Sequence, residues 1–243
     1  PMFWKNGVLT NLKTSLSNDA EEVISITDFE VIGNDVYFVG YTKKRLIAFE
    51  DYSLVYWKNG IMTIVHNYGG HELNQARIKV ENNDVYITGR NNNSTSITGH
   101  INGYYINGVF NEISNSILNG LAVNNNELYV FGTVNNTNYY KNITTNSETT
   151  IASASNGISN IVFDNNNMYL TDGGNIYKNG ILFDDGSTTT GGIKDFEVLN
   201  DNTYKITQVG VFSFISYLTI NGVETMSLPN GDGSFQAIYV VQN

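Results

Sequence analysis

The sequence predicts an all-β protein made of repeated four-stranded antiparallel sheets. Two short motifs alternate along the 243 residues, one ending in Asn-Gly and the other centred on Asn-Asp-Val-Tyr. Each motif has the pattern of a β-hairpin, and a pair of hairpins recurs about every 40 residues. No window shows a sustained 3.6-residue apolar period, which excludes helical repeat folds. Four short strands per repeat are typical of a β-propeller blade.

The first motif is an aromatic residue, any residue, and then Asn-Gly, placed between two apolar segments. Asn and Gly adopt positive φ at little cost, and a two-residue type I′ turn needs positive φ at both central positions. Other Asn-Gly pairs, at 102, 119 and 156, lack the aromatic residue two places earlier. We therefore expect a hairpin at each of six copies, two of them blurred: Phe3–Gly7, Tyr56–Gly60, Tyr104–Gly108, Tyr139–Ile143, Ile176–Gly180 and Leu218–Gly222.

The second motif is an apolar residue followed six positions later by a tyrosine, with a short Asn/Asp/Gly turn between them. Apolar and polar residues alternate ahead of the turn, as in Phe29-Glu30-Val31. This pattern predicts a strand, a tight turn and a second strand that carries the tyrosine. The five copies are Val31/Tyr37, Val80/Tyr86, Val123/Tyr129, Phe163/Tyr169 and Val198/Tyr204.

Together the motifs give five complete four-stranded repeats between about Asp28 and Leu228. The chain opens with one more hairpin and ends with an apolar segment, residues 237–241, that resembles a first strand. We therefore expect one domain, residues 1–243, folded as a six-bladed β-propeller whose closing blade is shared by the two ends of the chain. Such closure removes exposed sheet edges. No segment supplies the second strand of the closing blade, so five blades are the alternative.

The repeated aromatic residues have a structural explanation. Trp4, Trp57, Tyr105, Tyr140 and Tyr177 share one place in the repeat, and the five tyrosines of the second motif share another. Residues at equivalent places in stacked repeats usually pack one repeat against the next. We expect these side chains to lie in the core.

The alternation of Asn-Asp-Val-Tyr-x-x-Gly with Tyr-Trp-Lys-Asn-Gly resembles the repeat of secreted bacterial β-propeller proteins. The resemblance covers nearly the whole chain, and the copies ending at Gly60 and Gly89 match best. It implies the propeller fold and export to the cell surface or beyond, and it implies no particular activity. Because the chain begins at Pro1, with neither an initiator Met nor a signal peptide, we expect it to be a processed piece of a longer product.

Charge and composition exclude several classes of partner. Thirteen Lys and Arg stand against 23 Asp and Glu, a formal charge of −10. Such a chain should repel phosphate backbones, so we expect no nucleic-acid binding. No run approaches the length of a membrane-spanning helix, so we expect no membrane insertion. The chain has no Cys, which removes disulfides and thiolate chemistry.

Loop lengths indicate where binding residues could lie. The connection between second and third strands varies widely, from 10 residues (Tyr169 to Asn179) to 22 (Tyr37 to Asn59), whereas the hairpin turns keep one length. Variable loops on a rigid scaffold are common binding sites, although unused loops drift in length as well. In the first two blades these connections, together with the variable loop from the fourth strand of one blade to the first strand of the next, gather basic, aromatic and Asn side chains, which suit a carboxylate or a sugar. The candidate ligand-binding residues are Lys43, Lys44, Arg45, Tyr68, His71, Arg90, Asn92 and His100.

Catalytic and metal chemistry have weaker signals. The three His residues lack metal-ligand spacing, so no metal ligand is assigned, and no cofactor is expected. The segments 184–187 and 230–233 could bind Ca²⁺, although both are more typical of turns. Glu30 and Glu197 hold equivalent places in two blades, but a glycosidase pair must lie within roughly 5–9.5 Å. No Gly-x-Ser-x-Gly motif is present.

Three functional hypotheses follow. The first is a monomeric, non-enzymatic binding module, secreted or displayed at the cell surface, that recognises a glycan or a protein through the variable loops. The second is a hydrolase or lyase with an acidic site at the central channel. The third is a passive spacer within a longer surface protein. A ligand in the variable loops favours the first hypothesis, and a ligand or metal in the channel favours the second.

Overall fold

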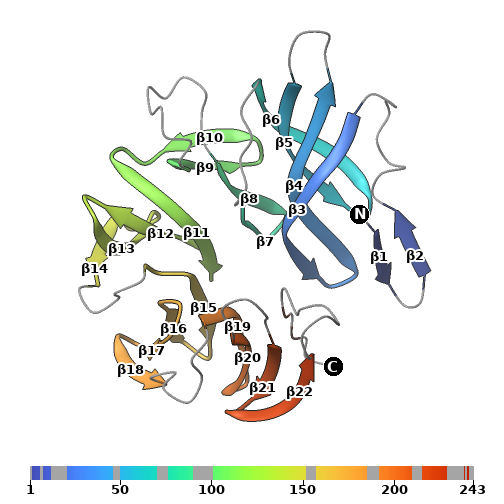
Figure 1. Cartoon of the computed structure of the whole chain (residues 1–243). Coiled ribbons are helices and arrows are strands. Elements are labelled where there is room, and N and C mark those ends of the chain that lie inside the picture. The colour runs from blue at the N-terminus through green and yellow to red at the C-terminus, as the bar shows by residue number, and fades with distance from the viewer. Residues whose placement is uncertain are drawn as a thin grey trace. The chain divides into compact units, whose positions relative to one another are not determined.

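The computed structural model describes residues 2–5, 8–11, 21–45, 50–69, 76–89, 101–151, 157–184, 192–209, 215–228, 238 and 240. The chain forms two compact units, residues 1–126 and 127–243. All the regular elements of the described residues are strands (Figure 1).

Unit 1 begins with a two-stranded antiparallel hairpin, β1 (Met2–Lys5) and β2 (Val8–Asn11). Two four-stranded sheets follow, each with its strands in sequence order. Blade 1 consists of β3 (Glu21–Ile32), β4 (Asp35–Arg45), β5 (Glu50–Lys58) and β6 (Ile61–Gly69). Blade 2 consists of β7 (Ile78–Glu81), β8 (Asp84–Gly89), β9 (Gly103–Ile106) and β10 (Val109–Glu112).

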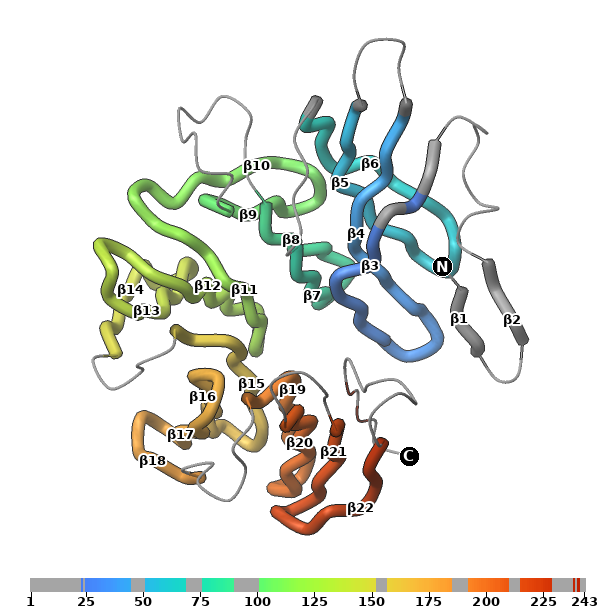
Figure 2. Tube along the Cα trace, in the orientation of Figure 1, coloured from blue at the N-terminus to red at the C-terminus, as the bar shows by residue number. Residues whose placement is uncertain are grey.

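Blade 3 consists of β11 (Ser116–Asn124), β12 (Glu127–Val134), β13 (Thr137–Asn142) and β14 (Ser147–Thr150). Blade 4 consists of β15 (Asn160–Asp164), β16 (Asn167–Thr171), β17 (Ile176–Lys178) and β18 (Ile181–Asp184). Blade 5 consists of β19 (Gly192–Leu199), β20 (Asn202–Val209), β21 (Ile215–Ile220) and β22 (Val223–Leu228). Figure 2 follows the same path as a Cα trace.

The fold class is therefore confirmed as an all-β propeller of four-stranded antiparallel blades. The described residues form five such blades, so the alternative count of five is the one observed and six is not. The difference arises at the closing blade. The hairpin β1–β2 is a separate two-stranded sheet, and of residues 237–241 only Ile238 and Val240 are described, neither of them in a strand.

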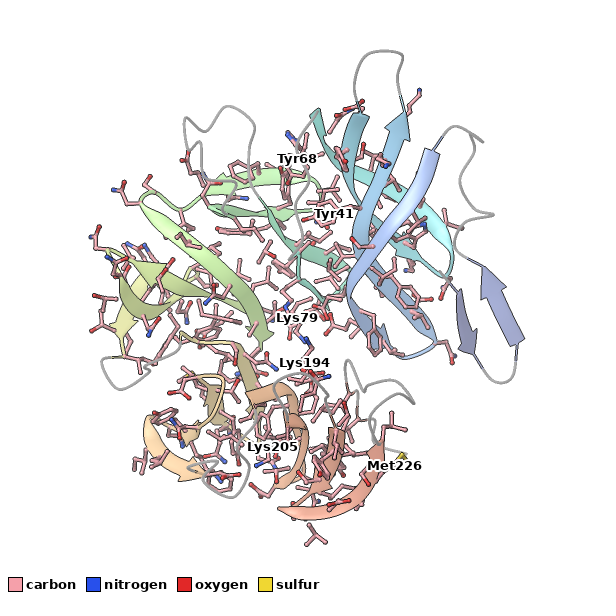
Figure 3. The ribbon with its side chains drawn as sticks, in the orientation of Figure 1. Tyr41, Tyr68, Lys79, Lys194, Lys205 and Met226 are labelled. Atoms are coloured by element: carbon pink, nitrogen blue, oxygen red, sulfur yellow. The ribbon has the colours of Figure 1, made fainter. Side chains whose placement is uncertain are left out.

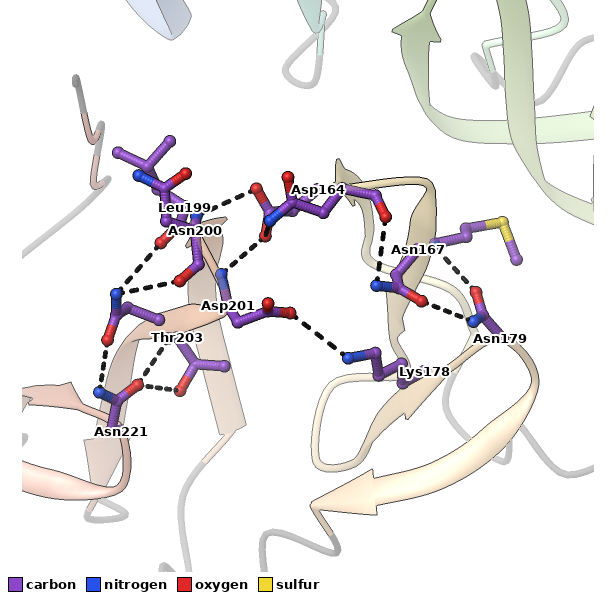
Figure 4. Close-up of polar contacts among 12 residues, drawn as sticks. Asp164, Asn167, Lys178, Asn179, Leu199, Asn200, Asp201, Thr203 and Asn221 are labelled. Atoms are coloured by element: carbon purple, nitrogen blue, oxygen red, sulfur yellow. Dashed lines mark hydrogen bonds and ion pairs between the residues drawn. The ribbon is translucent and has the colours of Figure 1, made fainter.

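The Asn-Gly motif has two roles in the fold. Asn59 and Gly60 have φ values of 50° and 86°, as the predicted type I′ turn requires. In addition, the Asn59 side chain joins the third strand to the second: its Oδ1 accepts the Val36 N–H (2.9 Å) and its Nδ2 donates to Asp35 (2.7 Å). The same pair of side-chain bonds recurs at Asn107, Asn179 and Asn221, and Figure 4 shows the last two.

Blade 3 departs from this pattern because its third-to-fourth-strand turn is longer. Asn142 uses its Oδ1 to accept the Thr145 N–H (3.1 Å), inside the turn itself. Its Nδ2 donates to Glu127 (3.1 Å), and the Leu128 N–H donates to Thr144 Oγ1 (3.2 Å) instead of to an asparagine. The fourth strand, β14, is consequently displaced in sequence relative to those of the other blades.

The repeated aromatic residues occupy the core only in part. Five are buried, namely Tyr37, Trp57, Tyr105, Tyr169 and Tyr177, and these confirm the prediction. The Trp4 side chain lies outside the described residues. Four others were predicted to lie in the core but are only half-buried: Tyr86, Tyr129, Tyr140 and Tyr204. Two of these, Tyr129 and Tyr140, line the site described next.

Candidate functional site

A groove of about 810 Å³ lies between the outer part of blade 3 and blade 4, entirely within unit 2. We call it the blade 3/4 groove. Its volume falls in the range typical of small-molecule sites. Strands β12 to β17 and the turns beside them line it: Tyr129, Tyr140, Asn142, Ser147, Thr149, Thr150, Ile151, Phe163, Met168, Leu170, Tyr177, Asn179 and Gly180.

Tyr140 reaches the groove because blade 3 pairs its two middle strands in a shifted register. In blades 1, 2 and 4 the tyrosine of the second motif pairs with the residue before the motif asparagine: Tyr37 with Lys58, Tyr86 with Ile106, and Tyr169 with Lys178. In blade 3 Tyr129 pairs with Asn142 itself, so Tyr140 pairs with Phe131 and lies on the same face of the sheet as Tyr129. On the outer strand Thr149 is opposite Tyr140. A threonine covers little of its partner, and Tyr140 stays half-buried at the groove wall.

The lining combines aromatic rings with uncharged polar groups. Four rings contribute, those of Tyr129, Tyr140, Phe163 and Tyr177, and no lining residue is charged. The unit around the groove is acidic, because residues 127–243 contain 4 Lys and no Arg against 11 Asp and Glu, which gives a formal charge of −7. The groove is thus a neutral, aromatic-walled site within an acidic unit.

Two of the rings are held in place by fixed contacts on the blade 3 side. The Tyr129 ring lies 4.8 Å from the Phe163 ring of the next blade, centroid to centroid. The Tyr129 hydroxyl donates to Glu127 (2.6 Å). Burial, followed by this bond, raises the pKa of Tyr129 to about 12, so the hydroxyl stays protonated at neutral pH.

Tyr177 is fixed from the blade 4 side by a buried carboxylate. Its hydroxyl donates to Asp172 (3.2 Å), which is fully buried in the short connection between β16 and β17. Asp172 also accepts the backbone N–H groups of Gly174 (3.3 Å) and Asn175 (2.8 Å). A buried carboxylate with several donors is stable in place and orients its neighbours. The Tyr177 ring is therefore a rigid part of the groove.

This arrangement suits binding more than bond cleavage. The lining residues include neither a carboxylate nor a histidine, so the groove supplies no general acid–base pair. Its rings offer flat apolar faces, and the exposed Ser147, Thr149 and Thr150 offer hydroxyl groups that both donate and accept.

A carboxylate with unusual protonation lies elsewhere, in unit 1. Glu30 on β3 is buried, accepts the Val80 N–H and lies 3.8 Å from Lys79 Nζ. Burial raises the pKa of Glu30 to about 7, against the opposing effect of Lys79. Beside it, Asp28 accepts the Ile78 N–H (3.0 Å) and lies 3.9 Å from Arg77. These contacts join the first strands of blades 1 and 2.

Of the ligand-binding residues predicted from the variable loops, the structure describes the side chains of Lys43, Lys44 and Tyr68. Lys43 and Lys44 lie on β4 and pair with Tyr52 and Asp51 of β5, so their placement in a loop is wrong. Arg45 ends the same strand, and nothing is described of its side chain. Tyr68 on β6 is 1% exposed and belongs to the core of unit 1, where Figure 3 labels it. The rest of the predicted set lies outside the described residues: His71, Arg90, Asn92 and His100.

The described residues contain no group of three or more His, Asp or Glu side chains that could hold a metal ion. Of the two possible Ca²⁺ segments, only Asp184 is described, and it pairs with Lys205 Nζ (2.8 Å). No helix among these residues has the length and apolar character needed to span a bilayer.

Comparisons with known proteins give no family for this chain. No family model matches, and no curated protein matches. Solved structures that resemble it include a computationally designed protein, Ika8 (13% identity, TM-score 0.46), covering 90% of this chain and 66% of that one. The match to the Pyrococcus horikoshii acylaminoacyl peptidase (13% identity, TM-score 0.48) covers 89% of this chain and 40% of the peptidase. The match to YjhT (10% identity, TM-score 0.47) covers 88% of this chain and 89% of YjhT. The chain therefore spans less than two thirds of the first two, and at these scores the similarities assign neither a family nor a function.

Proposed function

We propose that this chain is a non-enzymatic binding module, secreted or displayed at the cell surface, that holds a neutral glycan in the blade 3/4 groove. The observation that carries the proposal is the combination of aromatic walls with an uncharged polar lining. The C–H face of a sugar ring packs on an aromatic face, whose π-system is partly negative. Sugar hydroxyls both donate and accept, as do the Ser, Thr, Asn and Tyr groups of the groove.

Charge supports a neutral ligand over an acidic one. No lining residue offers a positive charge, and unit 2 carries a formal charge of −7. A sialic acid or uronic acid would bring its carboxylate into this field without a cationic partner, which costs binding energy. The proposal therefore places recognition on the side of the blades instead of on the long loops.

A glycan array that contains matched neutral and acidic oligosaccharides tests the proposal. We expect hits among the neutral glycans, and we expect these hits to disappear in Thr149→Phe, which places a ring over Tyr140. Thr149→Ser is the control and should keep them. Hits confined to acidic glycans, or neutral hits that survive Thr149→Phe, would place recognition elsewhere.

The hydrolase alternative has one observation in its favour, the Glu30 pKa of about 7. A carboxyl group poised near neutrality can act as a general acid or base. Its contacts to Val80 and Lys79, however, fit a structural role between two strands equally well. Hydrolysis of a neutral oligosaccharide that is lost in Glu30→Gln would favour this alternative.

We also propose that Ile238 belongs to the first strand of a sixth blade. The Ile238 N–H donates to Asp195 (2.7 Å), just as the Ile78 N–H of blade 2 donates to Asp28 (3.0 Å) of blade 1. Asp28 and Asp195 both precede Phe-Glu-Val in the sequence. Amide hydrogen exchange tests this: the Ile238 amide should be protected and should exchange faster in Asp195→Ala. An unprotected amide in the wild-type chain would refute the sixth blade.

A further inference from the structure

The outer strand of blade 4 has an unusual surface. Ile181, Leu182 and Phe183 of β18 are consecutive, large and apolar, and they are 74%, 52% and 50% exposed. The outer strand of blade 3 in the same unit, β14, is Ser-Glu-Thr-Thr. Three exposed apolar residues in a row are a liability in a folded domain unless they have a function.

The position of β18 determines what backbone could cover it. It is the last strand of its sheet, paired on one side with β17. An edge strand presents N–H and C=O groups that a further extended strand can pair with. The natural occupant of such an edge is therefore an extended polypeptide segment, bound by β-augmentation.

A cleft beside β18 determines which side chain such a segment would carry. The cleft measures about 540 Å³ and lies between β18 and the turns of blade 5. Leu182 and Phe183 contribute apolar groups, and Asp201 contributes an exposed carboxylate, whereas the Asp184 carboxylate is paired with Lys205 (2.8 Å); Thr203, Asn221 and Gly222 complete the lining. An arginine or lysine matches the apolar groups with its stem and Asp201 with its cationic tip.

The segment that carries Asp201 is held in place by hydrogen bonds from its backbone. The side chain of Asp164 accepts the backbone N–H groups of Asn200 (3.1 Å) and Asp201 (2.8 Å), as Figure 4 shows. Lys178 lies 3.6 Å from Asp201, whose side chain is still 64% exposed. A guanidinium group can therefore approach Asp201 from solvent and bind it in a bidentate pair.

Charge favours a cationic segment over a second copy of this chain as the occupant of the β18 edge. A second copy of this chain would bring another unit of formal charge −7 to the same surface, which opposes association. A cationic segment is attracted instead. From these observations we propose that the β18 edge binds an extended polypeptide segment in which apolar residues alternate with arginine or lysine, with one basic side chain in the Leu182–Asp201 cleft.

The experiment titrates the full chain with two fluorescent octapeptides, one alternating valine with arginine and one alternating valine with glutamate. Fluorescence anisotropy is measured for the wild type, Leu182→Lys and Met226→Lys. Met226 is the matched control, because it lies on the outer strand of blade 5, is 53% exposed, and gains the same charge. Circular dichroism verifies that each variant is folded.

We expect the wild type and Met226→Lys to bind the arginine peptide with equal affinity, and the glutamate peptide not to bind. Leu182→Lys should weaken binding of the arginine peptide at least tenfold. An equal loss in both variants would show attraction to the acidic surface as a whole and overturn the proposal. It would also be overturned if the folded wild type bound neither peptide, or if it formed a concentration-dependent dimer that Leu182→Lys abolishes, since the occupant would then be a second copy.

Discussion

Substitution of Thr149 is expected to change ligand binding without harming the fold. Thr149 of β14 and Tyr140 of β13 are directly opposite each other. Phe110 and Tyr105 of blade 2 are also directly opposite, and their rings lie 5.0 Å apart, centroid to centroid. Thr149→Phe should form an aromatic pair of this kind with Tyr140. Aromatic cross-strand pairs contribute roughly 0.2–1 kcal/mol. The free energy of unfolding should therefore stay constant or rise by that amount.

The same substitution should remove binding. The new ring would occupy the space over Tyr140 that the ligand is proposed to use, so we expect affinity for a neutral glycan to fall at least tenfold, or about 1.4 kcal/mol. For a chain of this size the melting temperature should rise by about 0–4 °C. Isothermal titration calorimetry and thermal unfolding give the two quantities, with Thr149→Ser as the control.

Two results would refute this reasoning. If Thr149→Phe bound the glycan as the wild type does, the blade 3/4 groove would not be the site. If it lowered the melting temperature by more than about 5 °C, the pairing inferred from blade 2 would not apply to blade 3, and loss of binding would carry no information about the site.

The remaining predictions concern stability. The pKa of Glu30 in the folded chain is about 7, above its ordinary value, so the folded state holds this proton more tightly and the free energy of unfolding falls as pH rises from about 4.5 to 7. Glu30→Gln should remove this pH dependence and should be more stable than the wild type at pH 8 by roughly 3 kcal/mol at most. If urea unfolding shows the same pH dependence in both proteins, the pKa assignment is wrong. Asn59→Ala removes two hydrogen bonds and places alanine, which tolerates positive φ less well than Asn, at φ 50°, so it should cost about 2 kcal/mol, whereas the exposed Thr63→Ala should cost under about 0.5 kcal/mol. Lys205 is buried and paired with Asp184, so Lys205→Ala should cost about 2 kcal/mol by removing this charged hydrogen bond (Figure 3 labels Lys205). Chemical denaturation that shows no change would refute that role.

The hairpins and the four-strand repeat could be predicted from the sequence because local chemistry decides them. The turn at Asn59-Gly60 needs positive φ, and few residues other than Asn and Gly accept it. The side-chain bonds from Asn59 to Val36 and Asp35 could not be foreseen from turn chemistry alone, although they explain why the two motifs keep their residues together. Blade number depends on pairing between distant segments, which the motifs do not specify.

The candidate site was not predicted because pairing across strands decides where space remains. Lys43 and Lys44 were expected in a loop, but β4 continues through them since β5 supplies a partner for each residue. Tyr68 was expected at the surface, but it packs in the core of unit 1. The place of Tyr140 at the groove also depends on strand pairing, because Tyr129 pairs with Asn142 itself and not with the residue before it. The motif gives no signal of this shift by one residue.

The central claim is that a neutral glycan binds in the blade 3/4 groove. The most direct measurement is a ¹H–¹⁵N NMR titration of the labelled chain with a neutral glycan selected on the array. We predict that the largest shift changes fall on residues of the groove, among them Tyr140, Thr149 and Asn179, with little change at Lys43 or Lys44. Shift changes confined to the long loops of blades 1 and 2, with the groove unaffected, would contradict the claim.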